Sequence, residues 1–222
     1  MTAIDNGTIH YRDEVVRKLI HLCSISIPIV YYYIPRNNAL LILLIVTFFA
    51  IIVDLLRYFL PTFAKLFYSF FGFLLRKHEK DVKIKTLNGA SYVLISATIC
   101  VFIFPKIFVV TAFGILIISD TLAALIGRKF GKHKLLKKSF EGTLAFFLSA
   151  IVVVIATPKI TGNIYEYLIG FIACFIGAIV ENISFGWIDD NLSIPISIGL
   201  VMWLLYIIFL PNVALILPNV PR

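Results

Sequence analysis

The 222-residue sequence is poor in charged residues. Charged side chains make up 14% of it, whereas a soluble domain contains about 25%. Apolar residues make up 60%, against about 45–50% in a soluble domain, and the mean hydropathy is +0.99. This composition excludes an aqueous globular fold, a disordered tail and a secreted disulfide scaffold. It predicts an integral membrane protein.

Cysteine is also scarce, and Cys23, Cys100 and Cys174 lie far apart within apolar runs, with no CxxC spacing. A zinc site or a disulfide framework needs other spacings, so we interpret all three as packing residues. Residues 1–18 are polar and contain acids, which does not fit the short basic and then apolar form of a cleavable signal. The first span is therefore expected to stay in the membrane.

Apolar runs, by contrast, are abundant, and seven of them approach the roughly 20 residues that a membrane-spanning helix needs. They cover Leu19–Ile34, Ala39–Val53, Gly89–Phe104, Ile107–Ile126, Gly142–Thr157, Tyr165–Val180 and Leu192–Leu210. Because Pro28 and Pro195 lie in the first and last runs, kinks or breaks are expected there. The sequence predicts an all-α, polytopic membrane protein with one domain over residues 1–222.

The segment Leu55–Leu75 is apolar but contains Arg57, Pro61 and Lys65. Its many aromatic residues favour the headgroup boundary, so the alternatives are an eighth span and an interfacial helix. With seven spans and the N-terminus inside, sixteen of the twenty lysines and arginines lie on the inner side. An eighth span would move the basic cluster 128–138 to the other side from the basic N-terminus. The charge bias therefore favours seven spans plus an aromatic-rich interfacial helix.

The net charge of +8 needs no nucleic-acid partner in this topology. The basic loops indicate which side of the membrane is cytoplasmic, and they attract anionic lipid headgroups. We expect a multi-pass protein whose basic loops, and any active site among them, lie on the cytoplasmic face.

Acidic residues at membrane depth are costly and call for an explanation. Asp54, Asp120, Glu181 and the pair Asp189 and Asp190 stand at or near the inner ends of the predicted spans. Asp120 has the most apolar surroundings of these acids. A structural ion pair with a basic residue from another helix is the alternative to a functional role for Asp120.

The stretch 117–143 combines an acid with glycines and basic residues. After Asp120 it contains Gly127, Arg128, Gly131, Lys138 and Ser139. Phosphate binding needs closely approaching backbone N–H groups and cations, and a nearby carboxylate can hold Mg²⁺. The spacing does not match GxxxxGK[ST] and no strand precedes it, so this is not a P-loop. The alternatives are a helix end with a turn at the glycines and a solvated loop at the lysines.

The run Glu181–Pro195 contains three acids and no lysine or arginine, although it lies on the inner side. Its carboxylates are therefore expected to meet a cation, either Mg²⁺ or the basic residues of the other inner loops. We favour metal binding, and the alternative for Asp189 and Asp190 is N-capping of the last span.

Five segments appear in a recognisable order: RKLIH at 17–21, NGASY at 88–92, SDTLAALIGRKFG at 119–131, KSFEGTLA at 138–145 and the acidic run 181–195. Together they resemble the CTP-dependent lipid kinases, which include dolichol kinase, phytol kinase and fungal diacylglycerol kinase. The resemblance spans most of the chain and extends more distantly to phosphatidate cytidylyltransferases.

The resemblance implies transfer of a phosphoryl group from CTP to the hydroxyl of a membrane lipid: a polyprenol or dolichol, a phytol-type alcohol or diacylglycerol. It also implies a need for Arg17, Lys18, Asp120 and Gly127. The expected catalytic residues are Asp120, Arg17, Lys18 and Glu181, and the expected Mg²⁺ ligands are Asp120, Asp189 and Asp190. The expected nucleotide-binding residues are Gly127, Arg128, Gly131, Lys138 and Ser139.

Two other functions are compatible with the same residues. A cytidylyltransferase would use CTP but transfer CMP to a phosphatidate, and a small transporter would use Asp120 as an ion or proton site. The polar residues gather at one membrane face, which favours an interfacial enzyme over a transporter. A small-residue face on the sixth run, at Gly170, Ala173, Cys174, Gly177 and Ala178, is suited to close packing with a second copy of the chain.

Overall fold

The computed structural model describes residues 10–75, 86–184 and 189–222, and this part is almost entirely helical. Its helices are α1 (Tyr11–Cys23), α2 (Ser26–Tyr33), α3 (Arg36–Phe59), α4 (Pro61–Phe71), the short 3-10 helix η1 (Gly72–Leu74), α5 (Gly89–Ile103), α6 (Lys106–Phe130), α7 (Phe140–Ala156), α8 (Ile164–Ile183) and α9 (Asp190–Phe209). Strands β1 (Lys134–Leu135) and β2 (Lys138–Ser139) form a small antiparallel hairpin between α6 and α7. The predicted all-α class is confirmed.

Five helical stretches of the described part are long and apolar enough to cross a membrane. They are Tyr11–Tyr33, Arg36–Phe59, Lys106–Phe130, Ile164–Ile183 and Asp190–Phe209. Helices α5 and α7 are apolar but shorter. Each of the seven predicted runs coincides with one or two of these helices, so the membrane architecture is confirmed, whereas the count of seven spans stays a prediction.

The first predicted span is broken into α1 and α2, as its proline indicated. Pro28 has no N–H to donate to the carbonyl of Ser24, and that carbonyl accepts instead from the N–H of Ile27 at 2.9 Å. The expectation of a break at Pro195 was wrong, because α9 runs through it from Asp190 to Phe209. Pro195 stands near the start of α9, where only one backbone hydrogen bond is lost.

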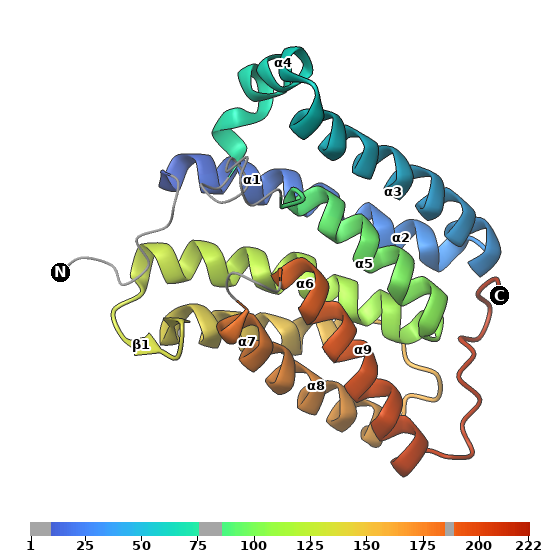
Figure 1. Ribbon diagram of the computed structural model, residues 1–222. Helices are drawn as coiled ribbons and strands as arrows, with labels where there is room; N and C mark the ends of the chain where they lie inside the picture. The colour runs from blue at the N-terminus through green and yellow to red at the C-terminus, as the bar shows by residue number, and fades with distance from the viewer. Residues whose placement is uncertain (1–9, 76–85, 185–188) are drawn as a thin grey trace.

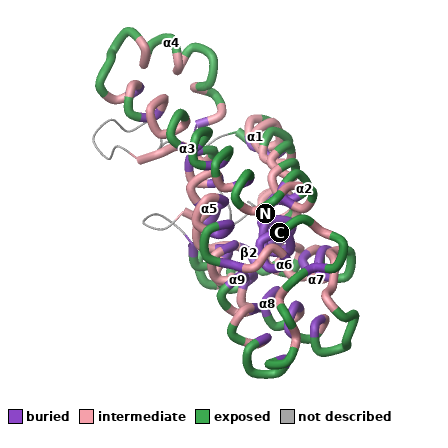
Figure 2. Tube along the Cα trace, turned by 90° about the vertical axis from the view of Figure 1, so that its right-hand side faces the viewer, coloured by how far each residue is buried: buried purple, intermediate pink, exposed green. Residues whose placement is uncertain are grey.

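Helix α3 continues past the predicted end at Val53 to Phe59. Arg57 does not stop it, because its buried guanidinium lies 3.4 Å from the carboxylate of Asp54, one turn earlier on the helix. Pro61 then ends α3 and starts α4. The aromatic-rich α4 has no buried residue and stands away from the bundle in Figure 2, and its place at the membrane interface stays a prediction.

Helix α6 is the centre of the bundle. Its residues from Ile107 to Ile117 are all buried, and α7 and α9 pack against it. An apolar surface on every side is what a helix surrounded by others requires. This central position holds Asp120, which lies further along the same helix, in the interior of the protein.

The small-residue face of α8 packs inside the chain. A Cβ added at Gly170 would lie 2.4 Å from Val154 of α7, and one added at Gly177 would lie 2.9 Å from Ile198 of α9. Among the cysteines, Cys100 and Cys174 are buried as expected, whereas Cys23 is exposed. Self-association through this face of α8 stays a prediction, but the face already contacts two helices of its own chain.

The start of α1 and the β1–β2 hairpin lie at one end of the bundle, and the C-terminus lies at the opposite end (Figure 1). We call the first of these the hairpin end. The predicted basic residues Arg76, Lys77, Lys80, Lys83 and Lys85, and residues 185–188 of the acidic run, lie outside the described residues. The alternation of helix directions brings the remaining basic and acidic loops to the hairpin end, where the candidate site lies.

Candidate active site

Lys18 and Asp120 form a buried ion pair between α1 and α6. The ammonium of Lys18 donates a short hydrogen bond to Oδ2 of Asp120, and both residues are almost completely buried. His21, one turn after Lys18, places Nε2 3.6 Å from the same oxygen. This distance is too long for a hydrogen bond, and Nε2 of His21 has no hydrogen-bond partner among the described residues.

A second ion pair joins the hairpin to α8 and α9. The Nζ of Lys138 lies 2.6 Å from Oε1 of Glu181 and 3.6 Å from Oδ2 of Asp190. Both acids are buried, and the other oxygen of Glu181, Oε2, has no hydrogen-bond partner among the residues that the structure describes. The basic loop and the acidic loop therefore meet, as their opposite charges suggested.

These two ion pairs belong to one site. Burial alone would lower the pKa of Lys138, but the carboxylates of Glu181, Asp190 and Asp120 together raise it above its ordinary value. Asp120 thus acts on Lys138 although the two residues belong to different pairs. We call the set Lys18, His21, Asp120, Lys138, Glu181 and Asp190 the charged cluster.

The hairpin that carries Lys138 is fixed by Asn182. The side-chain oxygen of Asn182 accepts from the backbone N–H of Lys137 at 3.1 Å, and its Nδ2 donates to the hydroxyl of Thr143 at 2.6 Å. Asn182 is fully buried, so this amide ties the hairpin to both α7 and α8. It therefore orients Lys138 toward the acids.

Arg17 and Arg128 lie at the edge of the cluster, on either side of Glu14. The carboxylate of Glu14 is buried and lies 3.5 Å from Arg17 on its own helix and 3.5 Å from Arg128 on α6. The structure thus brings the predicted residues Arg17 and Arg128 together through an acid that had no predicted role.

Gly127, Gly131 and Ser139 form a close contact between α6 and the start of α7. A Cβ at Gly127 would lie 2.9 Å from Oγ of Ser139, and one at Gly131 would lie 2.3 Å from the carbonyl oxygen of Gly127. The N–H of Gly131 donates to that carbonyl at 2.9 Å, and Oγ of Ser139 caps α7 by accepting from Gly142. Their predicted nucleotide binding stays a prediction, but the structure gives them a packing role.

Asp189 is the N-cap of α9, the alternative raised from the sequence. Its Oδ1 accepts from the backbone N–H of Asn191 at 2.9 Å and from the side-chain amide of Asn191 at 2.8 Å. Its neighbour Asp190 instead turns a carboxylate oxygen toward Lys138. The two acids of the pair therefore have different surroundings.

The chemistry of the charged cluster fits Mg²⁺. No group of three or more His, Cys, Asp and Glu side chains is arranged around one metal position in residues 10–75, 86–184 and 189–222. Mg²⁺, however, is often bound through one or two carboxylates plus substrate phosphates and water. Asp120 and Asp190, which interact electrostatically, supply two such carboxylates.

The NGASY segment belongs to a separate polar cluster between α3 and α5. Asp54 accepts from the backbone and side-chain nitrogens of Asn88, each at 2.9 Å, and from the hydroxyl of Ser91 at 2.7 Å. Arg57 completes this cluster beside Asp54. These contacts satisfy the carboxylate and fix the start of α5, so we assign Asp54 a structural role.

Sequence reasoning missed Glu14 and Asn182 as parts of this site. Glu14 stands three residues before Arg17, a spacing that places the two side chains on one helical face, and this was the available signal. Asn182 follows Glu181 directly, but its contacts with Lys137 and Thr143 depend on the packing of α7 against α8, which no local pattern shows.

Comparison with known proteins gives several relatives. The chain is 34% identical to the uncharacterized protein RP860 of Rickettsia prowazekii over 185 residues, covering 83% of this chain and 90% of the relative. It is 28% identical to CTP-dependent diacylglycerol kinase 1 of Schizosaccharomyces pombe, over 68% of this chain and 74% of the relative. It is 31% identical to a phytol kinase of Synechocystis, over 41% of this chain and 42% of the relative.

No family model matches the chain, and no solved structure matches it. The names of these relatives include two lipid kinases and no cytidylyltransferase.

Proposed function

We propose that the chain is a membrane lipid kinase, because its relatives include proteins named CTP-dependent diacylglycerol kinase and phytol kinase. In the proposed reaction, the hydroxyl of a lipid alcohol attacks the γ-phosphorus of CTP, a P–O bond to the lipid forms, and CDP leaves. The lipid hydroxyl loses its proton to a base on the protein.

The charged cluster is the observation that carries this proposal. Phosphoryl transfer depends mainly on positioning and on neutralising the charge of the phosphates. The cluster supplies cations and carboxylates from α1, α6, the hairpin, α8 and α9 at one place within a membrane bundle. Such buried charge is costly in a membrane protein and indicates a functional site.

The cations of the cluster suit a nucleotide triphosphate. Lys138 stays protonated because three carboxylates raise its pKa, and its side chain, on the hairpin, is only partly buried. We propose that Lys138 and Arg128 contact the phosphates and that Lys18 holds Asp120 in place. Arg17 adds positive charge at the same edge.

Asp120 and Asp190 are the proposed Mg²⁺ ligands. When bound, the ion would neutralise phosphate oxygens and orient the triphosphate. Asp189 is a weaker candidate than the sequence suggested, since one of its oxygens already caps α9.

Glu181 is the proposed base. Its Oε1 binds Lys138, and its buried Oε2 has no hydrogen-bond partner in the described part of the chain. Asp120, the other carboxylate considered for this role, already accepts the hydrogen bond from Lys18. Glu181 therefore has a free oxygen to accept the proton of the lipid hydroxyl.

The proposed site lies on the cytoplasmic side of the membrane. The hairpin carries several of the basic residues that the positive-inside rule assigns to the cytoplasm. A triphosphate cannot cross hydrocarbon unaided, so a site that uses CTP must open on the side of the membrane where CTP is present.

Incubation of the purified protein with γ-labelled CTP, Mg²⁺ and a lipid alcohol tests the function. A lipid kinase transfers the label to the lipid, whereas a cytidylyltransferase given phosphatidate releases it as pyrophosphate. Diacylglycerol, phytol and a polyprenol should be compared as acceptors, with Glu181→Gln as the inactive control. Absence of labelled lipid with every acceptor would contradict the proposal.

A further inference from the structure

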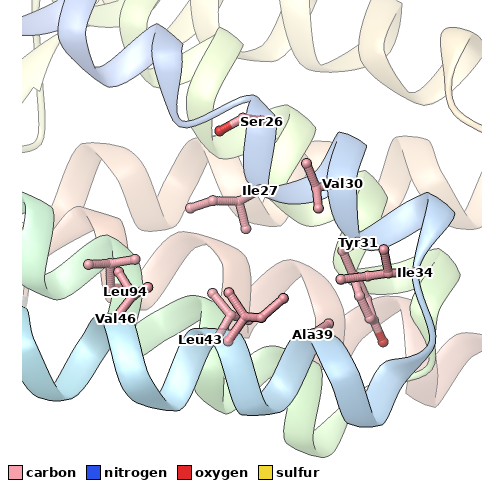
Figure 3. Close-up of a pocket in the computed structure, with 10 residues that line it drawn as sticks. Ser26, Ile27, Val30, Tyr31, Ile34, Ala39, Leu43, Val46 and Leu94 are labelled. Carbon is pink, nitrogen blue, oxygen red and sulfur yellow. The ribbon is translucent and has the colours of Figure 1, made fainter.

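An apolar groove of about 200 Å³ lies between α2, α3 and α5, outside the charged cluster. Figure 3 shows side chains of α2 and α3 pointing toward one another across it, with Leu94 of α5 beside them. The lining includes Ile27, Val30, Leu43 and Val46. Val30 and Val46 are also half exposed, so the groove opens toward the surroundings of the bundle.

The groove lies further along the first span than the charged cluster. Lys18 and His21 lie on α1, and Ser26 at the start of α2 already lines the groove. From His21 to Ile34, at the far end of the groove, the helical rise amounts to about 20 Å. The groove therefore extends from the level next to the site toward the opposite end of the bundle.

The groove is almost free of polar side chains. Among its lining residues only Ser26 and Tyr31 carry a hydroxyl. The hydroxyl of Tyr31 is buried and has no hydrogen-bond partner among the described residues. A polar ligand in the groove would be expected to form a hydrogen bond with this hydroxyl. A hydrocarbon ligand would form none.

The surroundings decide which kind of molecule reaches the groove. Both walls belong to helices long and apolar enough to span a membrane, so the open side faces hydrocarbon chains and not water. We propose that the groove binds the hydrocarbon chain of the acceptor alcohol, while the hydroxyl of that alcohol lies at the charged cluster. This inference rests on the proposed function and adds to it a site that selects acceptors by chain length.

A substitution that fills the groove tests the proposal. Val46→Trp places a large ring in the groove from α3 at a position that is already half exposed, which limits the cost to folding. Ile45→Trp is the matched control, because Ile45 is the next residue, has a similar exposure and does not line the groove. The acceptors are dioleoylglycerol, with long chains, and dioctanoylglycerol, with short ones.

We expect Val46→Trp to lower kcat/KM for the long acceptor by about fivefold relative to the short one, the effect of about one methylene group displaced from the groove. Ile45→Trp should leave this ratio unchanged. Tyr31→Phe should not weaken use of the long acceptor, since a hydrocarbon chain makes no hydrogen bond to the hydroxyl. An unchanged ratio in Val46→Trp, or a loss in Tyr31→Phe, would overturn the proposal.

Lipid retention separates this inference from the proposed function. Native mass spectrometry of protein incubated with dioleoylglycerol should detect bound lipid in the wild type and in Ile45→Trp, and less in Val46→Trp. Wild-type protein that retains dioleoylglycerol but phosphorylates no alcohol would contradict the function and leave the groove in place. Retention of membrane phospholipid in preference to the alcohol would show that the groove binds bulk lipid, which overturns the inference.

Discussion

Glu166 and Glu181 lie near opposite ends of α8, and both are almost completely buried, yet their carboxylates are used differently. Glu166 accepts hydrogen bonds from the backbone of Ile160 and Thr161, from the hydroxyl of Thr161 and from Tyr206. Glu181 accepts from Lys138 through Oε1 and leaves Oε2 without a partner in the described part of the chain. Both carboxylate oxygens of Glu166 therefore accept hydrogen bonds, whereas one oxygen of Glu181 can still accept a proton.

The first prediction compares Glu181→Gln with Glu166→Gln. Glu181→Gln should lower kcat by about 100-fold or more, because the amide cannot accept the proton of the lipid hydroxyl. Glu166→Gln should leave kcat per folded molecule unchanged and destabilise the protein by about 1–3 kcal/mol, because its amide NH₂ faces donors. Steady-state kinetics and thermal unfolding in detergent measure the two effects. Equal losses of kcat in both variants would show that Glu181 has no special role.

The second prediction concerns the Lys18–Asp120 pair. Asp120→Asn should abolish Mg²⁺-dependent turnover and also destabilise the fold by about 3–5 kcal/mol, since it leaves the Lys18 ammonium buried without its counter-charge. The double variant Lys18→Met/Asp120→Asn should regain much of the lost stability. It should remain inactive, because neither change restores the carboxylate.

Thermal unfolding and the γ-label assay, applied to the single and double variants, separate the two consequences. Active protein from the double variant would mean that the pair is only structural, which was the alternative to a functional role for Asp120.

Much of this architecture follows from local features of the sequence. Runs of apolar residues predicted the helices, and Pro28 predicted the break in the first span. The distribution of lysines and arginines predicted that the basic and acidic loops lie at one end of the bundle. These features depend on the hydropathy of each segment, on the missing N–H of proline and on the number of membrane passes. All three can be inferred from the local sequence. The meeting of Lys138 with Glu181 and Asp190 was predictable for the same reason, because opposite charges at one end of a bundle attract.

Other features depend on how distant segments pack. The length of α3 follows from the neutralisation of Arg57 by Asp54, and the apolar composition of 54–60 did not reveal it. Gly127 and Ser139 are residue types that suit phosphate binding and close helix packing equally well. Only the close approach of α7 to α6 in the structure shows their packing role. The groove between α2 and α3 likewise arises from helix placement, which the sequence does not encode locally.

The third prediction tests the packing role of Gly127. Gly127→Ala should destabilise the protein, because its Cβ would lie 2.9 Å from Oγ of Ser139. Adding Ser139→Ala removes that oxygen and should recover part of the stability, because the Cβ would still lie 3.3 Å from Cα of Gly142 and the N-cap of α7 is lost, at a cost of about 1 kcal/mol. Gly72→Ala is the control, since its Cβ would lie 3.6 Å from Cβ of Tyr68, an ordinary contact distance.

The measurement is thermal unfolding together with the KM for CTP. A loss of CTP affinity in Gly127→Ala with no loss of stability would instead favour a direct contact between this backbone and the nucleotide.

The fourth prediction concerns orientation in the membrane. A cysteine at Lys134, in the hairpin, should react with an impermeant thiol reagent from the cytoplasmic side, and one at Asn163, before α8, from the other side. Cys23 is exposed and should first be replaced by serine, whereas Cys100 and Cys174 are buried. Labelling of both introduced cysteines from one side would contradict an odd number of passes between the hairpin and this loop.

The fifth prediction assigns different roles to the two partners Lys138 and Asp190. Lys138→Met should raise the KM for CTP by about tenfold or more, the size of one lost hydrogen bond between charged groups, with a smaller effect on kcat. Asp190→Asn should instead lower kcat and raise the Mg²⁺ concentration needed for half-maximal activity, because an amide is a weaker ligand for the ion.

The competing explanation is that Lys138 and Asp190 only hold the hairpin against α9. In that case either single change lowers the melting temperature, and the remaining folded protein keeps the wild-type KM for CTP and the wild-type Mg²⁺ requirement. A role in binding metal and phosphates predicts that the change in KM or in Mg²⁺ requirement persists per folded molecule, because the lost group contacted the phosphates or the ion. Titration of CTP and Mg²⁺ alongside thermal unfolding, on the two single variants, decides between them.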